Sequence, residues 1–201
     1  MRIAIMLFDG VEELDWAGPW EVFTMWSALE RRARRRSIDV TSVADSSELV
    51  TCAKGIRVIP DTTWPALVDA EERPDLLVVP GGRGTRALID DAATLTRLRE
   101  LHAGGTQVAS VCTGALLLAS AGLLAGRPAT THHGALDELR GLDSSCDVRA
   151  DVRWVDDGDV LTAAGVSAGI DLALHLVDRH AGTEMARAVR AAIQYDPMPP
   201  V

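Results

Sequence analysis

The residues with the clearest chemistry lie between Gln107 and Leu118, where the sequence reads QVASVCTGALLL. A short apolar run ends at Cys112, and an apolar, Ala/Leu-rich segment follows directly after Thr113 and Gly114. This order is typical of a strand that passes through a tight turn into a helix, as in a nucleophile elbow. The partial positive charge of the helix N-terminus would favour the thiolate over the thiol. The stretch therefore predicts a reactive cysteine, with a small buried apolar residue as the alternative.

A cysteine nucleophile also needs a site for developing negative charge and a group that moves protons. The backbone N–H groups of Thr113 and of the Gly81-Gly82 turn are candidates for the first, because glycine lets the backbone approach a ligand closely. Asp15 is the candidate for the second, because an apolar pocket with tryptophans nearby would raise the pKa of its carboxyl group. The alternative for Asp15 is an acid that caps a helix starting near Pro19.

The histidines offer a less specific signal. A Cys–His dyad is the ordinary way to activate sulfur, but nothing in the spacing fixes His132 or His133 near Cys112. We expect a structural hydrogen-bonding role for each of them. No His or Cys pair has the spacing of a metal site, and no GxGxxG fingerprint is present, so we predict no metal.

Strands and helices alternate along the chain, which predicts an α/β fold with a mostly parallel sheet and helices on both faces. The runs 3–7 and 75–80 are expected to be strands buried on both faces, and the apolar run of Val108, Ala109 and Val111 is expected to be the central strand. The alternating stretch 38–44 is expected to be a further strand. The expected helices are 19–32, segments within 84–103, 115–119, 165–180 and 183–193. An Asp157-Gly158 turn predicts a hairpin between 152–155 and 160–163.

Three of the marked sites follow predicted strands directly. They are the acidic loop from Asp9 to Asp15, the Pro80-Gly81-Gly82 turn and Cys112. In parallel sheets ligands bind at the carboxyl ends of the strands, so these sites are expected to converge on one active site.

Composition bounds the class of protein. The 201 residues predict one domain spanning 1–201, and the net charge of −9 argues against nucleic acid as a partner. The basic cluster from Arg31 to Arg36 is interpreted as a solvated helix end. Three cysteines without a CxxC pair fit a reducing compartment, and we find neither a signal peptide core nor a membrane-spanning stretch. We therefore expect a soluble, cytoplasmic protein.

Three stretches together resemble the ThiJ/PfpI superfamily: VPGG at 79–82, SVCTGALLLASAGLLAGRPATTHH at 110–133 and TAAGVSAGIDLALHLV at 162–177. LDWAGPWEVF at 14–23 and IQYDPMPP at 193–200 are similar to its isonitrile hydratase branch. The resemblance implies a flavodoxin-like three-layer sandwich, a homodimer and hydration of isonitriles to N-substituted formamides through a thioimidate, without a cofactor. It implies a nucleophile at Cys112, with Asp15 and Thr113 as the other catalytic positions. We also expect Gly81, Gly82 and Gly114 to serve as an oxyanion or substrate-binding site, with the resemblance implying that the substrate is a small molecule.

The resemblance also separates this chain from other members. Protease-like and glyoxalase-like members carry His directly after the nucleophilic Cys, where this chain has Thr113. AraC-type regulators of the superfamily need a helix-turn-helix region after the domain, which this sequence does not show. The branch more often has Trp where His133 stands, so substrate preference is expected to differ if that residue lines the pocket. The alternatives left open are another cysteine-dependent activity on a small electrophile, and a non-enzymatic sensor in which Cys112 is oxidised.

Overall fold

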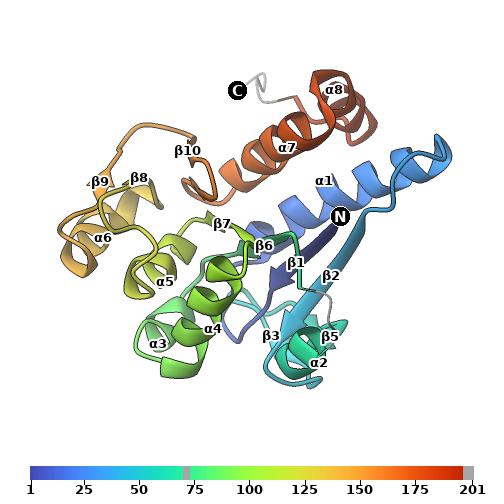
Figure 1. Cartoon of the computed structure of the whole chain (residues 1–201). Helices are drawn as coiled ribbons and strands as arrows, with labels where there is room; N and C mark the ends of the chain where they lie inside the picture. Colours follow the sequence, from blue (N-terminus) through green and yellow to red (C-terminus); the bar gives the residue numbers. More distant parts are fainter. Residues whose placement is uncertain (70–72, 197–201) are drawn as a thin grey trace.

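A seven-stranded sheet forms the centre of the molecule (Figure 1), in a computed structural model that describes residues 1–69 and 73–196. The strand order is β10-β11-β7-β6-β1-β2-β5; every neighbouring pair is parallel except β10 and β11, which form an antiparallel hairpin. Two small sheets, β3-β4 and β8-β9, lie outside it. The strands are β1 Arg2–Met6, β2 Asp39–Ala44, β3 Val50–Thr51, β4 Arg57–Val58, β5 Thr62–Thr63, β6 Leu76–Val79, β7 Gln107–Val111, β8 Pro128–Ala129, β9 Asp147–Val148, β10 Trp154–Asp157 and β11 Val160–Ala163.

Helices cover both faces of this sheet, as Figure 1 shows. Helices α1, α7 and α8 pack together on one face, and α3, α4 and α5 lie on the other. The helices are α1 Glu13–Arg32, α2 Trp64–Asp69, α3 Thr85–Leu88, α4 Ala92–Ala103, α5 Gly114–Ser120, the 3-10 turn η1 His133–Ala135, α6 Leu136–Leu142, α7 Ala168–Ala181 and α8 Thr183–Ala192. The prediction of a flavodoxin-like α/β fold with a mostly parallel sheet is confirmed.

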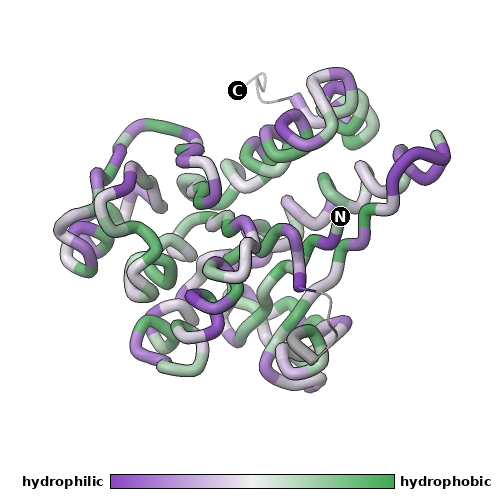
Figure 2. Tube along the Cα trace, viewed as in Figure 1, coloured by the Kyte–Doolittle hydropathy of each residue, from purple (hydrophilic) through white to green (hydrophobic). Residues whose placement is uncertain are grey.

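The central strands are apolar on both sides because both faces of the sheet are covered. In β1, Ile3 and Ile5 belong to the core beneath α1 and α7, whereas Ala4 and Met6 belong to the core beneath α5. The apolar colour of Figure 2 follows these strands, and the hydrophilic colour gathers on outer turns such as the end of α1. Such a double-sided core fixes the strands, and their carboxyl ends become rigid supports for a site.

One helix boundary differs from the prediction. Helix α1 begins at Glu13, well before Pro19, so Asp15 lies in its first turn and not in a loop. The backbone N–H of Glu12 donates to the carbonyl of Gly81 at 2.9 Å, and this anchor on the end of β6 starts the helix early. Pro19 is then a residue inside the helix.

The remaining elements follow the predicted pattern, including the antiparallel hairpin with its Asp157-Gly158 turn. Within residues 1–69 and 73–196, no helix is long and apolar enough to cross a membrane. The proline-rich end of the chain, which we predicted to be irregular, lies outside the described residues from 197 onwards.

Candidate active site

Cys112 lies at the turn between β7 and α5, in the backbone conformation of a nucleophile elbow. Its φ is 56°, a left-handed value that is uncommon for a residue with a side chain and that the surrounding structure must hold in place. Its N–H donates to the carbonyl groups of Ala163 and Ala164 at 3.1 and 2.9 Å. Its own carbonyl accepts the Thr131 hydroxyl at 2.8 Å. The end of β11 and the segment after β8 therefore fix the backbone of Cys112.

Asp15 reaches the same place from the first turn of α1. Its side chain is fully buried, and its Oδ2 accepts the N–H of Gly81 at 2.9 Å. A Cβ on Gly81 would lie 2.5 Å from the backbone nitrogen of Thr113, so only glycine allows β6, α1 and the elbow to meet this closely. The other oxygen, Oδ1, is buried without an N–H or O–H partner among the described residues, and the carboxyl group hydrogen-bonds the Cys112 thiol. One carboxyl oxygen is thus held, and the other is available for chemistry.

The Thr113 hydroxyl takes part in a network with the same glycine turn. It accepts the N–H of Gly82 at 2.9 Å, lies 3.2 Å from the Gly82 carbonyl, and is 3.3 Å from the Thr85 hydroxyl. The N–H groups of Gly81 and Gly82 are therefore both occupied, by Asp15 and Thr113. In this arrangement the two glycines position the catalytic candidates, which differs from the oxyanion role predicted for their N–H groups.

Burial dominates the electrostatics of the site. It raises the pKa of Asp15 to about 7, outweighing the N–H of Gly81, and it raises the pKa of Cys112 to about 12, with the Asp15 charge acting in the same direction. The expectation that the helix N-terminus lowers the thiol pKa is therefore wrong for the net effect. Between about pH 7 and 12 the Asp15–Cys112 pair holds one proton and one negative charge.

Two backbone donors act on the sulfur of Cys112. The N–H groups of Thr113 and Val166 both hydrogen-bond it and work to lower the thiol pKa, although burial is stronger. Val166 has a φ of 38°, an outlier for a β-branched residue. The Val166 N–H, in the loop after β11, thus adds a second hydrogen bond to the sulfur beside that of the Thr113 N–H.

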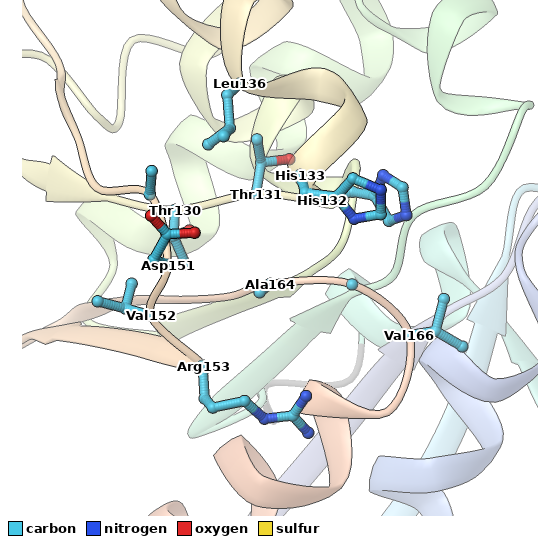
Figure 3. Close-up of a pocket in the computed structure, with 12 residues that line it drawn as sticks. Thr130, Thr131, His132, His133, Leu136, Asp151, Val152, Arg153, Ala164 and Val166 are labelled. Atoms are coloured by element: carbon cyan, nitrogen blue, oxygen red, sulfur yellow. The ribbon is translucent and has the colours of Figure 1, made fainter.

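A pocket of about 460 Å³ lies close to the turn that carries Cys112, and Figure 3 shows the residues that line it. Its wall is built from Leu136 and three chain segments: 130–133, 150–153 and 164–166. Thr131, which holds the Cys112 carbonyl, and Val166, whose N–H faces the sulfur, both belong to this wall. The pocket therefore neighbours Cys112 through these two residues, although neither Cys112 nor Asp15 belongs to its lining.

The structure brings together most of the residues predicted for the site. Asp15, Gly81, Gly82, Thr113 and Cys112 form one contiguous group. Gly114 supports this group from below, since a Cβ there would lie 2.0 Å from the carbonyl oxygen of Val79. Gly114 therefore allows α5 to start against the end of β6.

Some residues of the site were not found by sequence reasoning. Val166 contributes only its backbone, and Thr131 is one threonine among many, so neither carried a signal. His132 and His133 were visible as a pair, and both line the pocket. The structural hydrogen bond predicted for each is found for His132, whose Nδ1 accepts the N–H of Gly134 at 3.1 Å.

Across residues 1–69 and 73–196, His, Cys, Asp and Glu side chains form no group of three that could hold a metal ion. The three cysteines are free and buried. Cys112 and Asp15 offer a thiol and a carboxyl group in a buried site.

Comparison with known proteins gives consistent results. Residues 1–179 match the model of the DJ-1/PfpI family. The isonitrile hydratase of Pseudomonas putida is 36% identical over 202 aligned residues, covering 100% of this chain and 81% of that protein. The crystal structure of a ThiJ/PfpI family protein from Pseudomonas syringae superposes with a TM-score of 0.85 at 31% identity, covering 100% of this chain and 77% of that one. Drosophila melanogaster DJ-1beta, at 22% identity and a TM-score of 0.82, shares the fold, with 97% of this chain and 98% of that chain covered.

Proposed function

Because the chain belongs to the DJ-1/PfpI family, we propose that it is a cysteine-dependent enzyme that hydrates isonitriles to N-substituted formamides. The observation that carries this proposal is the buried Asp15 carboxyl group against the Cys112 thiol, beside a pocket for a small molecule. The likeness to a hydratase with this activity supports it. The reaction adds one water to R–N≡C and gives R–NH–CHO.

In the first half of the reaction, sulfur attacks the terminal carbon of the isonitrile. Asp15 as carboxylate takes the thiol proton while the S–C bond forms, and it passes that proton to the same carbon. The product is a thioimidate, R–N=CH–S–Cys112. Because the pair already shares one proton, no net charge enters or leaves the buried site in this step.

In the second half, a water adds to the thioimidate carbon and Asp15 receives its proton. Asp15 passes this proton to the imine nitrogen, which gives a tetrahedral R–NH–CH(OH)–S adduct and restores the carboxylate. The C–S bond then breaks, the hydroxyl proton returns through Asp15 to the sulfur, and the formamide leaves. Each proton of the water is accounted for, one on nitrogen and one exchanged with the thiol.

Backbone donors would stabilise charge during these steps. The N–H groups of Thr113 and Val166 face the sulfur and would stabilise it as the leaving thiolate. The Thr113 side chain holds the Gly81-Gly82 turn, and this turn holds the Asp15 carboxyl group near the sulfur. These roles replace the oxyanion role that we predicted for the two glycines.

A redox sensor is the alternative function from a different class. Peroxide oxidises the thiolate form of cysteine, and the raised pKa of Cys112 keeps that form scarce at neutral pH. The site is therefore better suited to a thiol whose proton is moved by Asp15 during turnover. A cytoplasmic location and a homodimer remain predictions from the sequence.

The test is steady-state turnover of an aryl isonitrile, with the formamide identified as product. We expect saturable turnover by the natural chain and none by Cys112→Ala. Cys146→Ala is the matched control, because Cys146 is also a buried free cysteine but lies between Asp143 and Asp147, outside the site. Turnover retained by Cys112→Ala, or absent from the natural chain, would reject the proposed function.

A further inference from the structure

Lys54 is the only lysine of the chain, whose other strongly basic side chains are all arginines. It lies in the loop between β3 and β4, against the first turn of α1. Its N–H donates to Oε1 of Glu13 at 2.6 Å, and its ammonium group pairs with Glu12. The hydrogen bond to Glu12 raises the pKa of Lys54, so the ammonium group stays charged at neutral pH. Backbone and side chain together dock the loop on the helix turn that carries Asp15.

Glu12, the N-cap of α1, connects this loop to Asp15. Its carbonyl accepts the N–H of Asp15 at 3.2 Å, and its own N–H donates to the Gly81 carbonyl at 2.9 Å. The Asp15 carboxyl group in turn holds the N–H of Gly81. The Glu12 side chain is 15% exposed and that of Lys54 is 68% exposed, so the ion pair reaches from the surface towards the buried acid.

Charged and titratable groups act on Asp15 from three elements. Burial has the largest effect on its pKa, the charge of Glu12 on α1 raises it further, and the charge of Lys54 lowers it. From the elbow, the Cys112 thiol hydrogen-bonds the carboxyl group. Glu12 and Lys54 therefore act on Asp15 in opposite directions while they are bound to each other.

Other titratable groups near this ion pair are uncharged at neutral pH. Burial raises the pKa of Cys52, and the charges of Glu13 and Asp9 act in the same direction, so this thiol is neutral. Burial lowers the pKa of His132, on which the charge of Glu12 also acts, so the ring is neutral as well. Neither group replaces the charge of Lys54.

We propose that Glu12 and Lys54 are a positioning pair for Asp15: Glu12 holds its backbone beside the glycine turn, and Lys54 balances the Glu12 charge that would otherwise repel the Asp15 carboxylate. Loss of Lys54 then disfavours the carboxylate, which takes the thiol proton in the proposed reaction, and loss of the Glu12 charge favours it. This inference rests on the proposed function, because it names positioning residues for the acid of that same site.

The test is the pH dependence of isonitrile turnover in variants that remove one charge. A shift of the titration by about half a pH unit would change kcat/KM at pH 6, relative to pH 9, by about threefold. We expect this ratio to fall in Lys54→Met and to rise in Glu12→Gln. The double variant should return close to the natural ratio, and Lys54→Arg should keep it. Arg57→Met is the matched control, because it removes an exposed cation from β4, which borders the same loop.

A loosened loop alone would move both single variants in the same direction. Ratios that move together, or do not move, therefore overturn the positioning pair and leave isonitrile hydration standing. Absence of turnover by the natural chain overturns the proposed function instead. The charge effect is then tested without a substrate, by a ¹³C NMR titration of the Asp15 carboxyl carbon assigned with Asp15→Asn. Its midpoint should rise in Lys54→Met and fall in Glu12→Gln, and any other pattern overturns the pair.

Discussion

Asp15 is a fully buried acid without a salt bridge among residues 1–69 and 73–196, and its proposed chemistry depends on that isolation. Lys54, the cation that acts on it through charge, is paired with Glu12 instead. Burial therefore raises the pKa of Asp15 to about 7, close to neutral pH. A carboxyl group with a pKa near the working pH can both accept and return a proton, which the two halves of the proposed reaction require.

The first prediction at this scale concerns pH. Because the active form holds Asp15 as carboxylate beside a protonated thiol, kcat/KM should rise tenfold per pH unit below about 7 and then level off. The measurement is an isonitrile pH–rate profile between pH 5 and 9. A profile that stays flat across that range would show that Asp15 does not supply the titrating group.

Asp15→Asn gives the control for this assignment. We expect it to lower the rate by about 10²–10⁴-fold and to remove the rise of kcat/KM with pH.

The same variant tests the effect of the Asp15 pKa on stability. A raised carboxyl pKa stabilises the fold while the group is protonated, below about pH 4, and that stability is lost as pH rises through about 7. At pH 8 the variant should therefore be more stable than the natural chain, by roughly 1–3 kcal/mol in urea unfolding. Glu21→Gln, which removes an exposed acid of the same helix, should change neither result.

At the scale of elements, the site depends on how closely α5 starts against β6. Gly114, the first residue of α5, lies under the Val79 carbonyl, and no other side chain fits that approach. The contact holds the elbow next to the glycine turn, and with it the distance between Cys112 and Asp15. The position at which α5 begins therefore helps to set the geometry of the candidate site.

Gly114→Ala tests this contact. The added Cβ, 2.0 Å from the Val79 oxygen, must push α5 away from β6, so we expect a loss of about 1–3 kcal/mol in the free energy of unfolding and of most activity. Urea unfolding and isonitrile turnover measure the two effects. Gly141→Ala is the control, because a Cβ at Gly141 in helix α6 meets nothing within 4 Å and should be neutral or slightly stabilising. Equal stability of the two variants would show that the close approach is unimportant.

Elements with strong local signals were predictable, and contacts made by the folded backbone were not. The strand–turn–helix around Cys112 and the convergence of strand ends followed from apolar runs and glycine turns in the sequence. The early start of α1 depends on the Gly81 carbonyl, a partner far away in the chain, so local periodicity placed the start near Pro19. The thiol pKa was misjudged because burial, a property of the whole core, outweighs the helix N-terminus.

The same distinction applies to the pocket. His132 and His133 were recognised as unusual, but only the packing of three distant segments makes them part of one wall. Val166 acts through its N–H in a strained backbone conformation that cannot be predicted from its residue type. The candidate nucleophile and its acid were therefore accessible from sequence, whereas the groups that would select a substrate were not.

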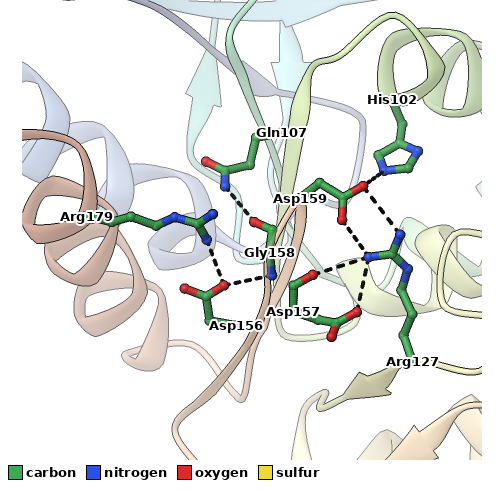
Figure 4. Close-up of polar contacts among 8 residues, drawn as sticks. All are labelled: His102, Gln107, Arg127, Asp156, Asp157, Gly158, Asp159 and Arg179. Atoms are coloured by element: carbon green, nitrogen blue, oxygen red, sulfur yellow. Dashed lines mark hydrogen bonds and ion pairs between the residues drawn. The ribbon is translucent and has the colours of Figure 1, made fainter.

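At the scale of the whole molecule, the β10-β11 hairpin links the end of the sheet to the pocket. The pocket segment 150–153 leads into β10, and 164–166 follows β11. Charged residues clamp the hairpin on both sides (Figure 4): Asp159 binds Arg127 and His102, and Asp156 binds Arg179 on α7. Figure 4 also shows Gln107 of β7 donating to the turn carbonyl at Gly158, at 2.9 Å.

Asp159→Asn tests whether this clamp stabilises the fold. The Arg127 hydrogen bonds lower the pKa of Asp159 to about 2, so its contribution is present above about pH 4 and is lost as pH falls through about 2. Because the side chain is half exposed, solvent screening limits the effect to about 1 kcal/mol or less at neutral pH. Urea unfolding should show the variant less stable at pH 7, with a gap that narrows towards pH 2.5.

The matched control is Asp137→Asn, whose carboxylate pairs with Arg140 on the fully exposed surface of α6 and should leave stability unchanged. A stability difference between Asp159→Asn and the natural chain that is the same at pH 7 and pH 2.5 would assign the effect to packing instead of charge.

If that stability difference narrows as expected, the same variant should bind substrate less well at pH 7, because a looser hairpin displaces both 150–153 and 164–166. KM should then rise more than kcat falls, since Asp15 and Cys112 are held by other elements.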